Sequence, residues 1–187
     1  MSKVVVIGGG ASGLVASILA SNSNEVTILE GNDKCGKKIL LTGNGKCNYW
    51  NEDISIDHYN TNNKEILEKI ITEKNQEEVL SFLEKLGIYP KIKNGYYYPY
   101  SNQATSVRTL LLKELEKRNI KIVSNFKVTE IKQENNMFMI YSDKEKIVAD
   151  KVILATGSKA CPKTGSDGSG YSLLESLGHH INPVTPT

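Results

Sequence analysis

The pattern of apolar residues at the start of the chain predicts an α/β fold. Residues 4–7 form a continuous apolar run, which is typical of a buried parallel strand. Small and apolar residues at 11–20 predict a helix that packs closely on the sheet, and residues 26–29 predict a second strand. The order strand, helix, strand favours a parallel sheet covered by helices.

A long excursion, residues 30–119, separates the second strand from the next parallel strand expected at 120–123. Apolar residues at helical spacing predict three helices with core-facing stripes: Ile66, Ile70 and Ile71, then Val79, Phe82, Leu83 and Leu86, then Val107, Leu110, Leu111 and Leu115. Gly87 is expected to end the second helix, and residues 88–99 predict a hairpin that turns at Asn94-Gly95.

The remainder of the chain predicts an antiparallel meander and a return to the sheet. Three short strands are expected, at 127–131, 137–141 and 146–148. Residues 151–157 predict a fully buried parallel strand that ends in small residues, where a ligand can approach. A second glycine turn at 165–170 precedes a final helix expected at 171–177.

The first expected strand runs directly into Gly8-Gly9-Gly10-Ala11-Ser12-Gly13, a G-x-G-x-x-G pattern. Glycines in such a turn let backbone N–H groups approach a pyrophosphate, and the N-terminus of the following helix adds a partial positive charge. Glu30 ends the second strand, where an acidic residue accepts hydrogen bonds from a ribose. Because a carboxylate repels a 2′-phosphate, the pattern favours FAD or NAD over NADP. We expect the dinucleotide to contact Gly8, Gly10, Ala11, Ser12, Gly13 and Glu30.

Charge and cysteine content narrow the class of protein. Lys and Arg total 23 against 21 Asp and Glu, a net charge of +2 that does not favour a nucleic-acid or membrane partner. No apolar run is long enough to cross a bilayer and the first residues read as a strand, so we expect a cytoplasmic protein. Cys35, Cys47 and Cys161 are widely spaced and odd in number, which favours reduced thiols over disulfides or a metal site.

The loop after the second strand contains further candidate ligands. Lys37 and Lys38 suit phosphate neutralisation, although solvated lysines are the plainer alternative. Four residues offer compact donors where a flavin ring is expected, with an ordinary Asn/Gly turn as the alternative: Thr42, Asn44, Gly45 and Asn48. Cys47 has no C-x-x-C partner and is expected to be a packed side chain, not a redox thiol. The tyrosines at 96–100 either form an aromatic wall over a planar substrate or pack on a helix.

Four segments together resemble the HI0933-like flavoprotein family, which includes aminoacetone oxidases and bile-acid reductases. They are the glycine motif with Glu30, the segment Thr42-Gly43-Asn44-Gly45-Lys46-Cys47-Asn48, the strand end Ala155-Thr156-Gly157, and Pro162-Lys163-Thr164-Gly165-Ser166 with Gly168 and Gly170-Tyr171. The resemblance covers most of the chain and implies a three-layer Rossmann-like FAD-binding domain of the glutathione-reductase type, with an antiparallel β-meander. It also implies that FAD contacts the backbone near Val128 and the small residues Ala155, Thr156 and Gly157.

The chain departs from the family pattern in length and in five residues: Lys46, Tyr96, Ser158, Ala160 and Cys161. Lys46 stands where the family usually has Arg, which keeps the charge but loses a bidentate fork, and Tyr96 stands where an Arg usually follows the glycine. Family members have an inserted substrate domain after a position near residue 187 and then a return segment that completes the FAD domain. The resemblance therefore implies that residues 1–187 are the N-terminal part of an FAD-binding domain, ending in a crossover at 182–187, and that this part is inactive alone.

These observations favour an FAD-dependent oxidoreductase that acts on a small organic substrate, with NAD(P)H as a candidate electron donor. Two alternatives remain open: a catalytically inactive nucleotide-binding fragment or interaction module, and a NAD-binding reductase, which the long excursion and the second glycine turn disfavour. His58, His179 and His180 are scattered and lack a paired carboxylate or nucleophile at motif spacing. We therefore assign no catalytic residue and expect no bound metal.

Overall fold

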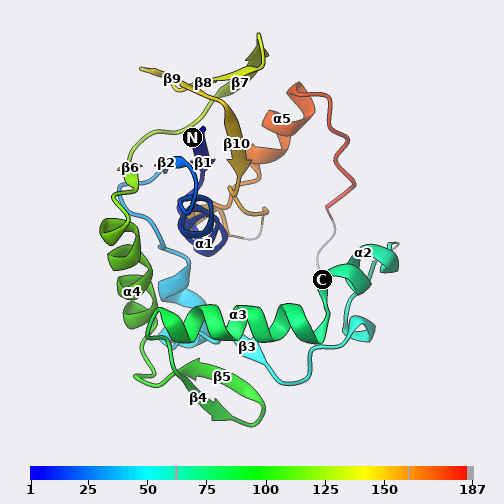
Figure 1. Cartoon of the computed structure of the whole chain (residues 1–187). Helices are drawn as coiled ribbons and strands as arrows, with labels where there is room; N and C mark the ends of the chain where they lie inside the picture. The colour runs from blue at the N-terminus through cyan, green and yellow to red at the C-terminus, as the bar shows by residue number, and fades with distance from the viewer. Residues whose placement is uncertain (62, 160, 185–187) are drawn as a thin grey trace. The chain divides into compact units, whose positions relative to one another are not determined.

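A computed structural model of the chain describes residues 1–61, 63–159 and 161–184 (Figure 1). The last three residues of the expected crossover at 182–187 lie outside the described residues. The chain divides into two compact units, one formed by Met1–Lys38 with Leu111–Thr187 and the other by Ile39–Leu110. Each unit has its own β-sheet structure.

Four parallel strands form the central sheet of the first unit, in the order β10-β1-β2-β6. They are β1 (Lys3–Ile7), β2 (Glu25–Leu29), β6 (Lys121–Val123) and β10 (Lys151–Leu154). Ile7 pairs with Leu29 on one side and Leu154 on the other, so three strands end level with one another. In a parallel sheet this shared carboxyl edge is where ligands bind.

A helix and a β-meander cover opposite faces of this sheet (Figure 1). On one face lies α1 (Ala11–Ala20), whose Leu14 and Ile18 are fully buried. On the other face, Val5 and Ile7 of β1 join a core with Ile140 of the meander. The elements on this side are β7 (Glu130–Glu134), β8 (Met137–Tyr141), β9 (Lys146–Ala149) and α5 (Ser169–Ser176), and a short turn, η3 (Pro162–Thr164), precedes α5 along the chain. Since strand side chains alternate between faces, each of β1's faces is buried by a different layer. The three-layer α/β fold is confirmed.

Two expectations for this unit need correction. The first meander strand begins at Glu130 rather than at 127, because Val128 places its side chain in the core without pairing its backbone in the meander. The strand expected to be fully buried, β10, is only half-buried at Val152, Ile153 and Leu154. It is an edge strand of the described sheet, and the flanking layers cover an edge strand less completely than a central one.

Arg118 closes the C-terminus of α1. Its guanidinium donates to the carbonyl oxygen of Ile18 at 3.2 Å and to Oδ1 of Asn22 at 2.7 Å. The same group donates through Nε to Oε1 of Glu114 at 2.6 Å, and this bond holds the pKa of Glu114 below its usual value. A cation at a helix C-terminus satisfies carbonyls that have no partner within the helix. The sequence Glu114 to Arg118 thus secures one layer of the unit.

The second unit combines short helices with an antiparallel sheet in the order β3-β5-β4. Its elements are η1 (Ile39–Gly45), β3 (Trp50–Asn51), η2 (Ile56–His58), α2 (Lys64–Ile70), α3 (Glu73–Lys85), β4 (Pro90–Lys93), β5 (Tyr96–Pro99) and the first part of α4 (Ala104–Lys117). Asn94 and Gly95 have φ values of 52° and 78°, as a two-residue hairpin turn requires. The expected hairpin is confirmed.

The spacing predicts that the apolar stripes of α2 and α3 face the core, but the structure buries them only in part: Phe82, Leu83 and Leu86 are half-buried. Ile66, Ile70 and Val79 are 52%, 57% and 44% exposed, and the structure buries no residue of either helix. By contrast, Val107 and Leu111 of α4 are buried as expected. Periodic spacing establishes that apolar residues share one face of a helix, but it does not supply an element to cover that face.

Candidate functional site

The first glycine turn joins β1 to α1 at the carboxyl edge of the parallel sheet. Gly8 has a φ of +103°, and a Cβ there would lie 2.5 Å from the carbonyl oxygen of Ala155 at the end of β10. A Cβ at Gly13 would collide with the carbonyl oxygen of Gly8. Glycine is required at both positions because the backbones of β1, β10 and α1 touch there.

Gly10 differs, because no protein atom requires it to be glycine. Its backbone is extended, with φ −76° and ψ −174°, and no atom of the described chain lies within 4 Å of where a Cβ would stand. The N–H groups of Gly10, Ala11, Ser12 and Gly13 find no acceptor among the described residues. A helix N-terminus with unpaired donors and open space in front of it suits a bound phosphate. The turn therefore fits the pyrophosphate of a dinucleotide.

Glu30 connects the end of β2 to this turn. The residue is 8% exposed, and its Oε2 accepts the N–H of Gly9 at 2.7 Å. Its Oε1 accepts both the N–H and the side-chain amide of Asn32, each at 2.8 Å. Three N–H donors therefore converge on one carboxylate. Glu30 accepts on both of its oxygens, whereas a glutamine would point its own NH₂ group at one of these donors.

The second glycine turn lies against the same region of the first unit. A Cβ at Gly165, whose φ is +92°, would stand 2.6 Å from Nδ2 of Asn32. Ser166 is buried and accepts a hydrogen bond from Nζ of Lys38 at 2.5 Å. A Cβ at Gly157 would lie 2.8 Å from Oγ of Ser166. The two glycine turns and the end of β10 are thus joined through Asn32, Lys38 and Ser166.

Asp167 fixes the backbone just before α5. Its Oδ1 accepts the N–H and the hydroxyl of Ser169 at 3.0 and 2.6 Å, and its Oδ2 lies 3.2 Å from the ammonium of Lys127. The hydrogen bonds from Ser169, followed by the ion pair with Lys127, lower the pKa of Asp167 to about 2. The carboxylate is therefore ionised at every physiological pH.

The structure gives intrachain partners to both candidate lysines of the first unit. Lys37 forms an ion pair with Asp33 at 2.6 Å, and this bond lowers the pKa of Asp33. Lys38 is bonded to Ser166, as described above. A phosphate at this loop would meet lysines that are already positioned by the protein, and not free surface side chains.

The other candidates of the first unit lie at the same edge of the sheet or in the core behind it. The side chain of Val128 is buried in the core, while its backbone N–H has no acceptor among the described residues. Ala155 donates its N–H to the carbonyl oxygen of Ile7. Thr156 places its hydroxyl where a Cβ on Gly170 would stand, so α5 starts in direct contact with the end of β10. Gly157 has a φ of +78°, which favours glycine.

Four candidates belong to the second unit and lie together on one loop: Thr42, Asn44, Gly45 and Asn48. The Thr42 hydroxyl donates to the carbonyl oxygen of Ile39 at 2.7 Å. Gly43, Asn44 and Gly45 have φ values of 55°, 53° and 80°, so the loop is held in a left-handed conformation. The side chain of Asn44 and the backbone of Gly45 are exposed.

The cysteines and histidines are not arranged for catalysis in the part of the chain that the structure describes. Cys47 is 7% exposed and in no disulfide, and burial raises the pKa of its thiol, in agreement with a packed side chain. His58 does have a carboxylate partner, contrary to the sequence expectation: Nε2 lies 3.0 Å from Asp53, which raises the pKa of the imidazole. The pair is exposed on the surface. Among the described residues, no three His, Cys, Asp or Glu side chains are grouped to hold a metal ion.

Sequence reasoning missed three residues that organise this region: Asn32, Ser166 and Asp167. Asn32 follows Glu30 by two positions, the spacing at which an Asn side chain folds back on a neighbouring group. Ser166 and Asp167 lie inside the second glycine turn, which the sequence marked only as a turn. Their partners, Lys38 and Lys127, are distant in sequence, so no local pattern indicates the pairs.

No described helix is both long and apolar enough to span a bilayer.

Comparison with characterised proteins agrees with this geometry. A "3-dehydro-bile acid delta(4,6)-reductase" of Clostridium scindens is 43% identical over 189 residues, which span all of this chain and 46% of that protein. A "Ribosomal RNA dihydrouridine synthase" of Escherichia coli is 25% identical over 181 residues, covering 96% of this chain and 45% of that protein. The chain thus spans about half the length of the curated relatives it matches.

Solved structures share the fold at low sequence identity. A 3-ketosteroid-delta4-(5alpha)-dehydrogenase of Rhodococcus jostii RHA1 aligns with a TM-score of 0.66 and 15% identity, over 94% of this chain and 53% of that one. Thermovibrio ammonificans THI4 aligns with a TM-score of 0.55 and 20% identity, over 87% and 60% of the respective chains. The model of the HI0933-like protein Rossmann domain matches residues 2–186. The chain therefore belongs to the HI0933-like family.

Proposed function

We propose that residues 1–187 are the N-terminal, FAD-binding part of a flavin-dependent oxidoreductase that reduces a carbon–carbon double bond in a small organic substrate. The observation that carries the proposal is the turn at Gly10: four successive N–H groups have no acceptor among the described residues, and no atom of these residues lies within 4 Å of the Gly10 Cβ position. The buried carboxylate of Glu30 lies beside it at the end of β2. These are the two groups that the ADP half of a dinucleotide needs, a donor cradle for phosphate and an acceptor for ribose.

The site residues of the first unit have the following roles in this proposal. The backbone of Gly8 to Gly13 binds the pyrophosphate. Glu30 uses three of the roughly four acceptor positions of its carboxylate within the protein. The fourth accepts a ribose hydroxyl, while the unpaired N–H of Val128 donates to the adenine ring. Lys38 and Ser166 keep the second glycine turn and the Ala155 to Gly157 segment in place.

We assign the loop of Thr42, Asn44, Gly45 and Asn48 to the flavin ring as its donors. The exposure of Asn44, Gly45 and Asn48 supports this assignment, as does the left-handed backbone at Asn44 and Gly45. FAD, when bound, supplies two-electron transfer. The protein would hold the flavin ring, leave one face of the ring open to the substrate and keep competing groups away from that face. The oxidised and reduced forms of the ring differ in charge and protonation, so compact, neutral donors can serve both.

The substrate class follows from the relatives. One relative's name describes reduction of the delta(4,6) positions of a 3-dehydro-bile acid, and the other's describes conversion of uridine to dihydrouridine. Both names imply the saturation of a carbon–carbon double bond. Because identity to the bile-acid enzyme is higher, we propose a small ring ketone with a conjugated double bond as substrate, and NAD(P)H as electron donor. The three cysteines, none of them in a disulfide, suit a reducing compartment, and we propose the cytoplasm.

The test is binding of FAD, NAD and ADP to the purified chain, with absorbance near the flavin bands recorded on the protein as isolated. FAD or ADP binding that is lost on Glu30→Ala supports the proposal. Tighter binding of NAD than of FAD would instead favour a NAD-binding reductase. If none of the three ligands binds, the nucleotide-binding proposal for residues 1–187 is wrong, and the alternative of an interaction module stays open. Reduction of a conjugated ring ketone by the longer gene product, monitored with NADH and with NADPH, tests the substrate class and the donor.

A further inference from the structure

The second unit contains a pocket that the flavin proposal does not use. It has a volume of about 460 Å³ and is lined by Lys46, Lys91, Lys93, Asn94, Tyr96, Tyr98 and Asn102. The volume lies within the roughly 300–1,000 Å³ of small-molecule sites. All seven residues belong to the 39–110 unit, so the pocket is complete within that unit.

Strand register explains why lysines and tyrosines share this pocket. In the β4–β5 hairpin, Lys91 pairs with Tyr98 and Lys93 pairs with Tyr96. Because strand side chains alternate, these four residues lie on one face of the hairpin and Tyr97 lies on the other. Tyr97 packs edge-on against Tyr49, with ring centroids 6.4 Å apart. The tyrosine cluster therefore divides between Tyr97, which packs on another tyrosine, and Tyr96 and Tyr98, which line the pocket.

The glycine-rich loop closes the pocket from another side. A Cβ on Gly43 would lie 3.5 Å from Cε1 of Tyr98, which places the loop backbone against that ring. Lys46, three residues further along the loop, adds a third ammonium group to the lining. The left-handed backbone at Gly43, Asn44 and Gly45 turns the chain over the hairpin face.

The positive charge of the pocket is not neutralised within the protein. No ion pair joins Lys46, Lys91 or Lys93 to a carboxylate of the described residues, and the lining includes no Asp or Glu. Glu52, beside Gly95 at the hairpin turn, is not part of the lining. Three ammonium groups match a phosphate, which carries between one and two negative charges, better than they match a single carboxylate.

The remaining lining suits a nucleobase. Tyr96 and Tyr98 offer aromatic rings on which a base can stack, and Asn94 and Asn102 offer amide groups that can both donate to and accept from a base edge. We propose that this pocket binds a nucleoside phosphate, with the phosphate on Lys46, Lys91 and Lys93 and the base against Tyr96 and Tyr98. Such a ligand occurs free, as the phosphorylated adenosine of NADPH, and within an RNA strand, and the experiment distinguishes these two sources.

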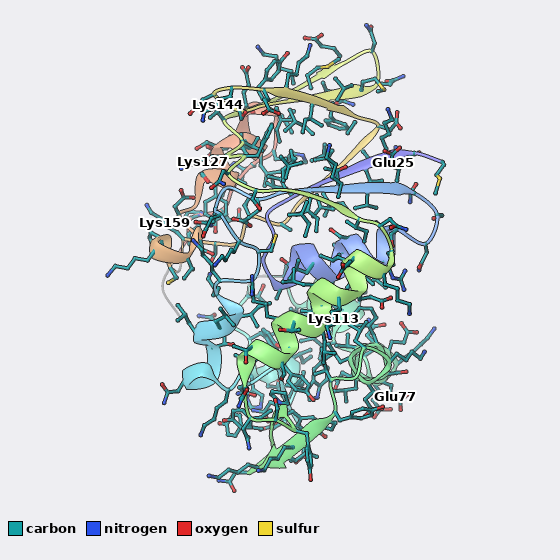
Figure 2. All side chains as sticks on the ribbon, turned by 90° about the vertical axis from the view of Figure 1, so that its left-hand side faces the viewer. Glu25, Glu77, Lys113, Lys127, Lys144 and Lys159 are labelled. Atoms are coloured by element: carbon teal, nitrogen blue, oxygen red, sulfur yellow. The ribbon has the colours of Figure 1, made fainter. Side chains whose placement is uncertain are left out.

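Calorimetric titration of the whole chain with adenosine 2′,5′-bisphosphate, pentauridylate and inorganic phosphate tests the proposal. We expect a Lys91→Gln, Lys93→Gln double variant to bind the favoured nucleotide at least about tenfold more weakly, since two charged hydrogen-bond donors are removed. The matched control is Lys113→Gln with Lys144→Gln, two exposed lysines that form no ion pair with any described residue and are labelled in Figure 2. It removes the same charge elsewhere and should change the dissociation constant by less than about twofold.

A second pair of variants tests the aromatic contact. Tyr96→Leu removes the ring and should weaken nucleotide binding about fivefold, whereas Tyr96→Phe keeps the ring and should bind normally. Neither change should alter binding of inorganic phosphate. Binding that persists in Gly10→Val belongs to this pocket and not to the first glycine turn.

The outcomes separate the sources and decide the proposal. Tighter binding of the bisphosphate identifies a free nucleotide, and tighter binding of pentauridylate, with affinity that falls steeply with salt, identifies RNA. Equal losses in the pocket variant and in the control variant would reduce the effect to general surface charge and overturn the proposal. Failure of both nucleotides to bind, or inorganic phosphate binding as tightly as either nucleotide, would also overturn it.

Discussion

Substituting Gly10 separates the two reasons for which a glycine occurs in the first turn. At Gly10 the backbone is extended and no protein atom lies within 4 Å of the Cβ position, so a side chain is tolerated by the fold. Replacing glycine where the backbone is compatible stabilises a protein by about 0.4–1 kcal/mol, because the unfolded chain loses freedom. We therefore expect Gly10→Ala and Gly10→Val to melt at or slightly above the wild-type temperature.

The same change should abolish dinucleotide binding. A Val side chain at Gly10 projects into the space in front of the unpaired N–H groups at the start of α1. Loss of two hydrogen bonds to a charged phosphate, at about 1.5–3 kcal/mol each, amounts to about 3–6 kcal/mol. The dissociation constant for ADP should rise between about a hundredfold and ten-thousandfold. Gly10→Ala, with a smaller side chain, should show a smaller rise.

The measurements are thermal melting and titration of ADP on the same preparations, with Gly8→Ala as the matched control. At Gly8 the φ of +103° and the 2.5 Å approach to Ala155 make a side chain costly to the fold itself. A destabilisation of about 1–3 kcal/mol, or a melting point lower by several degrees, is expected there. Unchanged ADP affinity in Gly10→Val would place the pyrophosphate elsewhere. A fall in its melting temperature like that of Gly8→Ala would show that Gly10 has only a structural role.

Three further predictions concern single side chains. Glu30→Ala should weaken ADP binding by about 1–3 kcal/mol. Glu30→Gln should also weaken it, because the amide turns an N–H donor toward the N–H donors of Gly9 or Asn32. Calorimetric titration of ADP into the wild type and both variants tests these expectations. The depressed pKa of Asp167 means that its contribution to stability is complete above the unfolded pKa of 3.8 and is lost as pH falls toward about 2. Because the Asp167 side chain is about one-third exposed, we expect it to contribute roughly 1 kcal/mol to the free energy of unfolding. Urea denaturation between pH 6 and 2.5 should show that the unfolding free energy of Asp167→Asn falls less steeply with acid than that of the wild type. Arg118→Met should lower the unfolding free energy by about 1–2 kcal/mol with ADP affinity unchanged, and a loss of ADP binding at unchanged stability would contradict a capping role.

The parallel sheet and the first glycine turn were predictable because their signals are local. Continuous apolar runs at β1 and β2, the small residues of α1 and the Asn94-Gly95 turn follow from backbone and burial preferences that act within a few residues. The register that brings Ile7 level with Leu29 and Leu154 is known only from the folded sheet.

The exposed faces of α2 and α3 were not predictable, because spacing says nothing about which element covers a helix. The same holds for half-buried β10, whose exposure depends on its place at an edge of the described sheet. The bond from Lys38 to Ser166 joins residues 128 positions apart, and no pattern in the sequence relates them. Long-range polar pairs of this kind depend on the folded chain path.

The sequence alone was enough to indicate a dinucleotide turn with an acidic partner, because motif spacing and strand order are properties of the chain. It could not say that Gly8 and Gly13 are required by neighbouring backbone while Gly10 is required by no protein atom, since that distinction depends on what surrounds each Cβ position. It also could not show that Glu30 receives three N–H donors before any ligand arrives. Nor could it show that Lys46 and the hairpin lysines line one pocket with two tyrosines, because strand register and loop closure bring these distant residues together only after folding.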